Sequence, residues 1–181
     1  TLGLVDIDRQ GLETMSTLGA RMNREWAAQI TIESSTERTD LLPEADFVIL
    51  SIEPGPREQL WRQDWEIPLR HGLRQPYAEN GGPGGFAHTA RNIPVLLAVA
   101  QDMERLCPAA WLINFTNPVP RLCLAATRYT RVKTVGLCHQ INAAHLIAFA
   151  VLAERWGIQV PPDLDTHPDP AHLQDRAPWV A

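Results

Sequence analysis

The sequence lacks a long hydrophobic run, a signal peptide and a basic stripe. No apolar stretch approaches the roughly 20 residues that a membrane-spanning helix needs, so we expect no membrane partner and a cytoplasmic location. The net charge of −5 argues against nucleic acid as a partner. There are three cysteines, Cys107, Cys123 and Cys138. They cannot all pair with each other, which favours cytosolic thiols over a disulfide framework.

What is present describes a globular protein. Of the 181 residues, 45% are hydrophobic and 20% are charged, which is enough apolar material for one domain with a sizeable core. The chain begins with Thr1 rather than Met, and it begins inside an apolar run that predicts a strand. We therefore expect a fragment.

Apolar runs alternate with segments of helical periodicity along most of the chain. The runs predict strands near residues 2–7, 30–33, 46–52, 110–115 and 132–137. The periodic segments predict helices at 9–26, 40–45, 57–70, 94–106, 119–129 and 141–156. This alternation predicts a Rossmann-like α/β domain over residues 1–160, with all five strands parallel in one sheet and helices on both faces.

Two stretches do not fit the alternation. Four glycines lie within residues 81–85 and predict a loop that either approaches a ligand closely or is a plain surface turn. Five prolines lie in the last 21 residues. They predict an irregular tail at 161–181, which would begin a substrate domain outside this chain.

Polar residues follow the predicted strands where each strand ends, the edge at which open α/β sheets bind ligands. Asn114 and Asn117 follow one strand, and Cys138 and His139 follow the next. A thiol beside an imidazole could bind a divalent metal. Asp6 ends the first predicted strand, where it suits either the ribose acceptor of a dinucleotide fold or a solvated strand end.

Two motifs in this part of the chain carry a family resemblance. Asn-Phe-Thr-Asn-Pro-Val at 114–119 and Gly-Leu-Cys-His at 136–139 resemble glycoside hydrolase family 4, the NAD- and Mn²⁺-dependent α-galactosidases and 6-phospho-glycosidases. The first motif is shared with lactate and malate dehydrogenases, whereas the second is more specific. The resemblance implies NAD, Mn²⁺ or another divalent metal, a small glycoside substrate, and a homo-oligomer at full length.

The resemblance also implies roles for single residues. Cys138 would be a metal ligand, and His167, which lies 29 residues later, would be the second, although its local sequence departs from the family pattern. His139 would protonate the leaving oxygen, and Glu79 would support the base that removes a sugar proton. That base would lie outside this chain, so the fragment alone is expected to be inactive.

Substrate and cofactor contacts are implied in the same way. Arg62 and Asn117 would bind the sugar, and an Arg fork suits a carboxylate or phosphate. An ordinary salt-bridged helix residue is the alternative for Arg62. The residues implied at NAD are Asp6, Ser51, Ile52 and Asn114.

The reaction implied is redox-assisted elimination. Oxidation at sugar C3 would acidify the C2 proton, whose removal would expel the C1 substituent, without the carboxylate pair of most glycosidases. A 2-hydroxyacid dehydrogenase of the lactate/malate type is an alternative, but the Gly-Glu-His-Gly context of its catalytic histidine is missing. An inactive fragment is the other alternative.

Overall fold

A computed structural model of the chain divides into two compact units, Thr1–Leu137 and Cys138–Ala181. The residues that it describes are 1–75, 79–138, 140, 144, 152 and 155–157. Predictions for the helix at 141–156 and the tail at 161–181 therefore fall largely or wholly outside the described residues. The domain boundary at residue 160 stays a prediction for the same reason.

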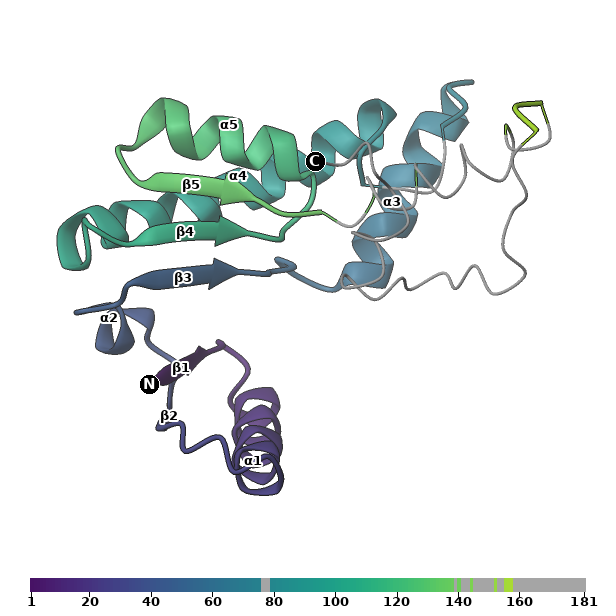
Figure 1. The fold of residues 1–181 in the computed structure, drawn as a ribbon. Coiled ribbons are helices and arrows are strands. Elements are labelled where there is room, and N and C mark those ends of the chain that lie inside the picture. The colour runs from purple at the N-terminus through teal and green to yellow at the C-terminus, as the bar shows by residue number, and fades with distance from the viewer. Residues whose placement is uncertain (76–78, 139, 141–143, 145–151, 153–154, 158–181) are drawn as a thin grey trace. The chain divides into compact units, whose positions relative to one another are not determined.

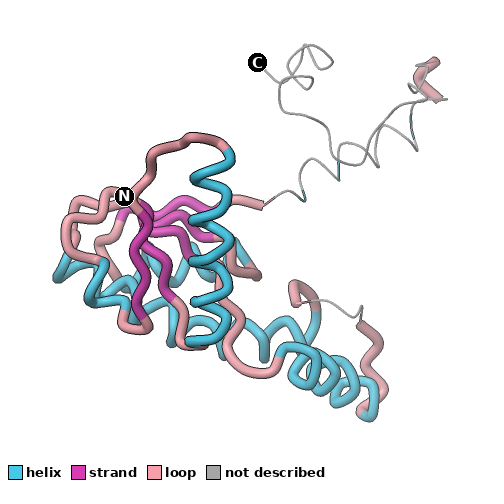
Figure 2. Tube along the Cα trace, turned by 90° about the horizontal axis from the view of Figure 1, so that it is seen from below, coloured by secondary structure: helices cyan, strands magenta, loops and turns pink. Residues whose placement is uncertain are grey.

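The first unit alternates strands and helices as predicted (Figure 1). Its elements are β1 (Leu2–Val5), α1 (Arg9–Glu25), β2 (Ile32–Ser35), α2 (Arg38–Leu41), β3 (Phe47–Leu50), α3 (Arg57–Arg70), α4 (Gly82–Leu106), β4 (Trp111–Asn114), α5 (Val119–Tyr129) and β5 (Lys133–Gly136). Every predicted strand is present, although β2 begins two residues later than expected. Helices flank the strands in the view of Figure 2.

All strand pairs are parallel, which confirms the Rossmann-like α/β class. The prediction of one continuous sheet is wrong for the described residues: β1 pairs only with β2, and β3, β4 and β5 form a separate sheet. The strand order of a doubly wound fold, 3-2-1-4-5-6, explains the break. If β1 to β5 are strands two to six of that order, a first strand would join the two sheets, and no described residue forms it.

The core lies between the three-stranded sheet and the helices α4 and α5. Leu96 and Met103 of α4, Leu112 of β4 and Leu122 of α5 have no exposed surface. Leu42, just after α2, joins the same cluster, and Arg38 of α2 forms an ion pair with Asp102 of α4 at 2.6 Å. The core therefore fixes the carboxyl ends of β3 and β4, where the polar loops begin.

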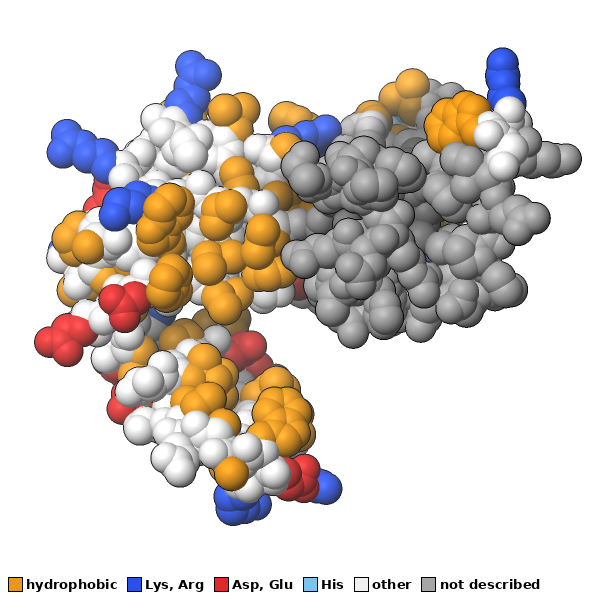
Figure 3. Space-filling view, in the orientation of Figure 1, with side chains coloured by type: hydrophobic (Ala, Val, Ile, Leu, Met, Phe, Trp, Pro, Cys, Tyr) orange, Lys and Arg blue, Asp and Glu red, His pale blue; other side chains and the backbone are white. Residues whose placement is uncertain are grey.

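The opposite face of this sheet is apolar and exposed. Side chains alternate across a strand, so Phe47 and Ile49 point away from the core and are 65% and 63% exposed. Trp111 lies beside Phe47 in the strand register. Figure 3 shows apolar side chains gathered over β3, β4 and β5 on this face.

The start of α4 differs from the prediction. The helix begins at Gly82, not at Pro94, so most of the predicted glycine loop is helical. The glycines serve helix packing: a Cβ at Gly84 would overlap the Gln75 side chain and the Asp64 carbonyl. A Cβ at Gly85 would lie 2.8 Å from the Asn80 carbonyl carbon. Close approach of α4 to its neighbours thus overrides the loop propensity of these residues.

Asp8 caps the start of α1. Its carboxylate accepts the Gln10 N–H at 3.1 Å at the start of α1, which satisfies one of the free amides of the first turn. None of the helices in the described part of the chain is long and apolar enough to cross a membrane.

Candidate functional site

The loops that follow β3 and β4 are tied together by side chains. The Thr116 hydroxyl accepts the Ile52 N–H at 2.8 Å. The Asn114 Oδ1 accepts the Thr116 N–H at 3.1 Å, and its Nδ2 donates to the Thr116 carbonyl at 3.0 Å. Asn114 is fully buried. Its amide orders the turn, and its contact with NAD stays a prediction.

The other amide of the motif reaches a distant carboxylate. Asn117 Nδ2 donates to Glu79 Oε1 at 2.7 Å, although the two residues are 38 positions apart. Arg121 of α5 holds the same segment, because its guanidinium donates to the Asn80 carbonyl and the Thr89 hydroxyl, both at 3.1 Å. The structure therefore brings together Glu79 and Asn117, two of the predicted site residues.

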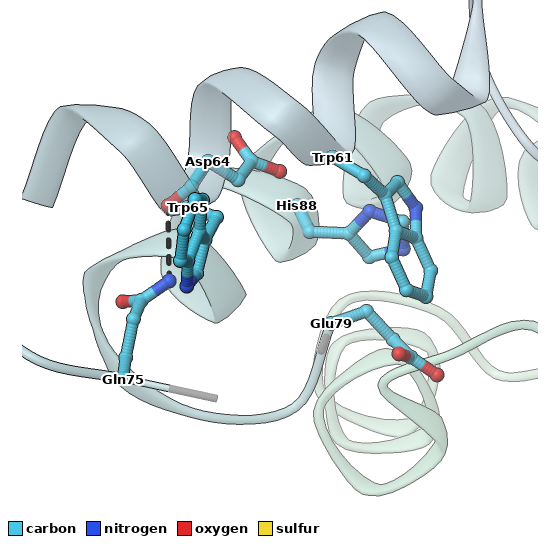
Figure 4. A pocket seen from close by; sticks show the side chains of 6 residues that line it. All are labelled: Trp61, Asp64, Trp65, Gln75, Glu79 and His88. Atoms are coloured by element: carbon cyan, nitrogen blue, oxygen red, sulfur yellow. Dashed lines mark hydrogen bonds between the residues drawn. The ribbon is translucent and has the colours of Figure 1, made fainter. Parts of the chain in front are cut away.

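Glu79 lies at a small pocket between α3 and α4 (Figure 4). The cavity has a volume of about 10 Å³, room for about one water molecule, and is lined by Trp61, Asp64, Trp65, Gln75, Glu79 and His88. Its walls are two indoles together with the polar side chains of the other four residues.

An ion pair and an amide bridge fix the pocket wall. Asp64 of α3 forms a bidentate pair with Arg91 of α4. Gln75 donates to the Asp64 carbonyl at 2.9 Å and accepts the Gly84 N–H at 3.1 Å. Both interactions join the two helices, so the carboxylate of Asp64 is engaged within the protein and its charge is compensated.

His88 is the pocket residue that the sequence reasoning missed. Only 3% of its surface is exposed, and its ring meets the Trp61 ring edge-on with the centroids 5.9 Å apart. Its Nδ1 has no hydrogen bond and lies 3.8 Å from Glu53 Oε1. The sequence holds no clear signal for it, because residue 88 precedes the predicted start of the helix.

The predicted cofactor residues lie at strand ends. Asp6 directly follows β1, is exposed, and accepts the Asp8 N–H at 2.9 Å through Oδ1. Ser51 directly follows β3 and is exposed, whereas Ile52 packs partly against the core. These positions agree with the edge at which doubly wound folds bind ligands, and their contacts with NAD stay predictions.

Arg62 lies apart from the small pocket. It is exposed on α3 and lines a second, wider cavity with Arg57, Glu58 and other residues of the first turns. Trp61 lines both cavities. Its neighbour Asp64, not Arg62, forms the ion pair in this region, and the predicted contact of Arg62 with substrate stays a prediction.

The three thiols differ in their surroundings. Burial raises the pKa of Cys107, and burial also raises the pKa of Cys123 despite a hydrogen bond from Asn114 that lowers it. Cys138 is exposed, and its sulfur accepts the Gln140 N–H at 3.4 Å. Only Cys138 is thus placed to offer a sulfur to a ligand from solvent.

The predicted metal site is only partly visible. His139 and His167 lie outside the described residues. Within the described part of the chain, no three His, Cys, Asp or Glu side chains cluster as metal ligands would. Cys138 fits the role of one soft ligand by chemistry and exposure, and its partner ligand stays a prediction.

Parallel strands with polar groups at their carboxyl ends define a Rossmann-like α/β protein. Comparison with known proteins identifies the family. The sequence model described as Family 4 glycosyl hydrolase matches residues 1–153, and the chain therefore belongs to that family. This assignment replaces the dehydrogenase alternative.

Individual relatives agree with the family. The chain is 38% identical to an α-galactosidase of Bacillus subtilis over 157 residues, which is 86% of this chain and 36% of the relative. It is 44% identical to an α-glucosidase of Erwinia rhapontici over 111 residues, 61% of this chain and 24% of the relative. The chain thus spans roughly a quarter to a third of the length of these relatives.

A solved structure shares the fold. The 6-phospho-β-glucosidase of Thermotoga maritima, crystallised with manganese, NAD⁺ and glucose-6-phosphate, superposes with a TM-score of 0.69. The match covers 87% of this chain and 37% of that protein at 24% identity. At this identity the likeness establishes the fold alone.

Proposed function

We propose that the protein carrying this chain is a glycosidase that cleaves O-glycosidic bonds by redox-assisted elimination. The observation that carries the proposal is the contact between Glu79 and Asn117 at 2.7 Å. The family resemblance implied sugar binding for Asn117 and support of the base for Glu79, and Glu79 also lines a small pocket with indole walls.

NAD and a divalent metal such as Mn²⁺ complete the proposed site, and the Thermotoga relative was crystallised with both. When bound, NAD supplies a hydride acceptor and the metal supplies a Lewis acid. Asp6, exposed directly after β1, would accept hydrogen bonds from the ribose hydroxyls. Cys138 would be one metal ligand and His167 the other.

The chain's own residues would bind the sugar and move one proton. Asn117 would hold a sugar hydroxyl while its amide keeps the Glu79 carboxylate in place. Glu79 would orient the base that removes the C2 proton, and the family resemblance puts that base outside this chain. His139 would give a proton to the leaving oxygen, so that the aglycone departs as a neutral alcohol.

Activity assays of the whole protein test this proposal. Hydrolysis of 4-nitrophenyl glycosides should need both NAD and Mn²⁺, and should stop when the metal is removed by EDTA and return when Mn²⁺ is added back. NAD should not be consumed, because the hydride returns to the sugar. Hydrolysis that proceeds unchanged without NAD would contradict the proposal and point to two-carboxylate chemistry.

A further inference from the structure

Glu79 lies in the short segment that precedes α4, outside any helix or strand. Its carboxylate accepts a hydrogen bond from the Asn117 amide at 2.7 Å, and that contact fixes only the end of a flexible side chain. A glutamate side chain has several rotamers, so its carboxylate stays in one place only if the backbone beneath it is held as well. The position of Glu79 in the proposed site therefore depends on what holds the backbone of this segment.

Arg121 of α5 holds that backbone. Its guanidinium donates to the carbonyl of Asn80, the residue next to Glu79, and to the hydroxyl of Thr89 in α4, both at 3.1 Å. The two donors, Nη2 and Nη1, belong to one planar group, so Arg121 links Asn80 directly to α4. Hydrogen bonds from a charged donor are stronger than those between neutral groups, which makes this link a firm one.

Helix α4 contacts the same segment through a glycine. A Cβ at Gly85 would lie 2.8 Å from the Asn80 carbonyl carbon and 3.0 Å from the Glu79 carbonyl oxygen, so this backbone lies directly against the helix. Thr89, one turn further along α4, is buried and donates its hydroxyl to the Gly85 carbonyl at 2.6 Å. The hydroxyl that Arg121 reaches is thus itself fixed within α4.

Arg121 and Asn117 act from one rigid support, the start of α5. Asn117 lies just before this helix, and Arg121 lies in its first turn. Leu122, the residue after Arg121, is fully buried in the core, which anchors this turn. The start of α5 therefore holds both the carboxylate of Glu79 and the backbone next to it.

Building on the proposed glycosidase function, we propose that Arg121 is a positioning residue for the removal of the sugar C2 proton. Through the Asn80 carbonyl it holds Glu79 where that carboxylate supports the base, and it needs no contact with substrate. A misplacement of about 1 Å within a site can lower a rate about 100-fold. Loss of Arg121 should therefore slow proton removal more than it weakens the binding of the sugar.

Steady-state kinetics of the whole protein with NAD and Mn²⁺ test the assignment. Arg121→Met keeps most of the side-chain length but no donor, and it should lower kcat for a 4-nitrophenyl glycoside at least about tenfold, with a smaller change in KM. Arg121→Lys restores a charged donor and should recover part of the loss. Arg128→Met, at an exposed position in the last turn of α5, is the matched control and should leave both constants unchanged. A wild-type kcat in Arg121→Met, or no recovery in Arg121→Lys, overturns the proposal.

A double-mutant cycle distinguishes positioning from a general loss of structure. If Arg121 acts through Glu79, Arg121→Met should lower kcat by less than about twofold once Glu79→Gln is present, because the effects of coupled residues do not add. Hydrogen–deuterium exchange at sugar C2, followed by NMR, gives the same comparison for slow variants. Losses that multiply would show that Arg121 acts independently of Glu79 and overturn this inference alone. Absence of NAD-dependent turnover with every glycoside instead contradicts the proposed function.

Discussion

The two sheets of the first unit have the same parallel pairing but differ in what covers them. In β3, β4 and β5, alternate side chains enter a core with α4 and α5. In β1 and β2 no residue is buried, and Leu12 is the buried residue of α1. Hydrogen bonding alone therefore does not make a stable layer, since burial of apolar surface supplies most of the stability.

The largest effect expected from this difference is on the free energy of unfolding. Leu122→Ala removes a fully buried side chain of α5 and should lower it by about 2–5 kcal/mol. Leu12→Ala should lower the free energy of unfolding by a smaller amount, because α1 packs against an open two-stranded sheet. Leu124→Ala, at a position that is 63% exposed in α5, is the matched control and should change it by less than about 0.5 kcal/mol. Urea denaturation measures all three, and equal losses at Leu12 and Leu122 would refute the comparison.

Thiol chemistry should distinguish the core from the strand end in a second way. Burial raises the pKa of both Cys107 and Cys123, so less of each is thiolate at neutral pH, and their alkylation should accelerate as pH rises. Cys138 is exposed and should react at least about tenfold faster at pH 7. Timed alkylation followed by peptide mass spectrometry measures the rates. Comparable rates at all three cysteines would contradict the burial pattern.

A smaller effect is expected at the start of α1. Asp8→Ala removes the carboxylate that caps Gln10 and should destabilise α1 by about 1 kcal/mol. Because α1 has little tertiary packing, the loss should appear as faster amide exchange within α1 and not in β4. Glu13→Gln, exposed in the same helix, serves as the control. Faster exchange throughout the unit would show that the two sheets unfold together.

The sequence predicted local structure better than the joining of its parts. Short apolar runs identified β1, β3, β4 and β5 because burial and strand length leave a clear pattern. The prediction of a single sheet was wrong because, in the strand order of a doubly wound fold, the β1–β2 pair and the sheet of β3, β4 and β5 meet only through another strand. The start of α4 was missed because Gly84 and Gly85 pack closely against neighbours, and this need is invisible in local propensity.

The site was predictable only where motifs exist. Asn117 and Glu79 were assigned from family motifs, but their spacing in the chain gives no hint that they touch. His88 has no motif, and its burial beside Trp61 depends on the approach of α3 to α4, which a single sequence does not reveal. Arg62 and Asp64 lie two positions apart, and tertiary packing turns Asp64 toward Arg91 while Arg62 stays exposed.

The central claim, redox-assisted elimination with a metal held at the end of β5, is tested most directly by Cys138→Ser in the whole protein. A hydroxyl stays protonated at neutral pH and so lacks the charge of the thiolate that binds metal, so the variant should bind Mn²⁺ weakly, lose activity, and lose hydrogen–deuterium exchange at sugar C2, with its circular dichroism unchanged. Asn117→Ala, the comparison variant, should raise KM and lower kcat with nearly unchanged Mn²⁺ affinity. Full turnover and normal C2 exchange in Cys138→Ser would contradict the account.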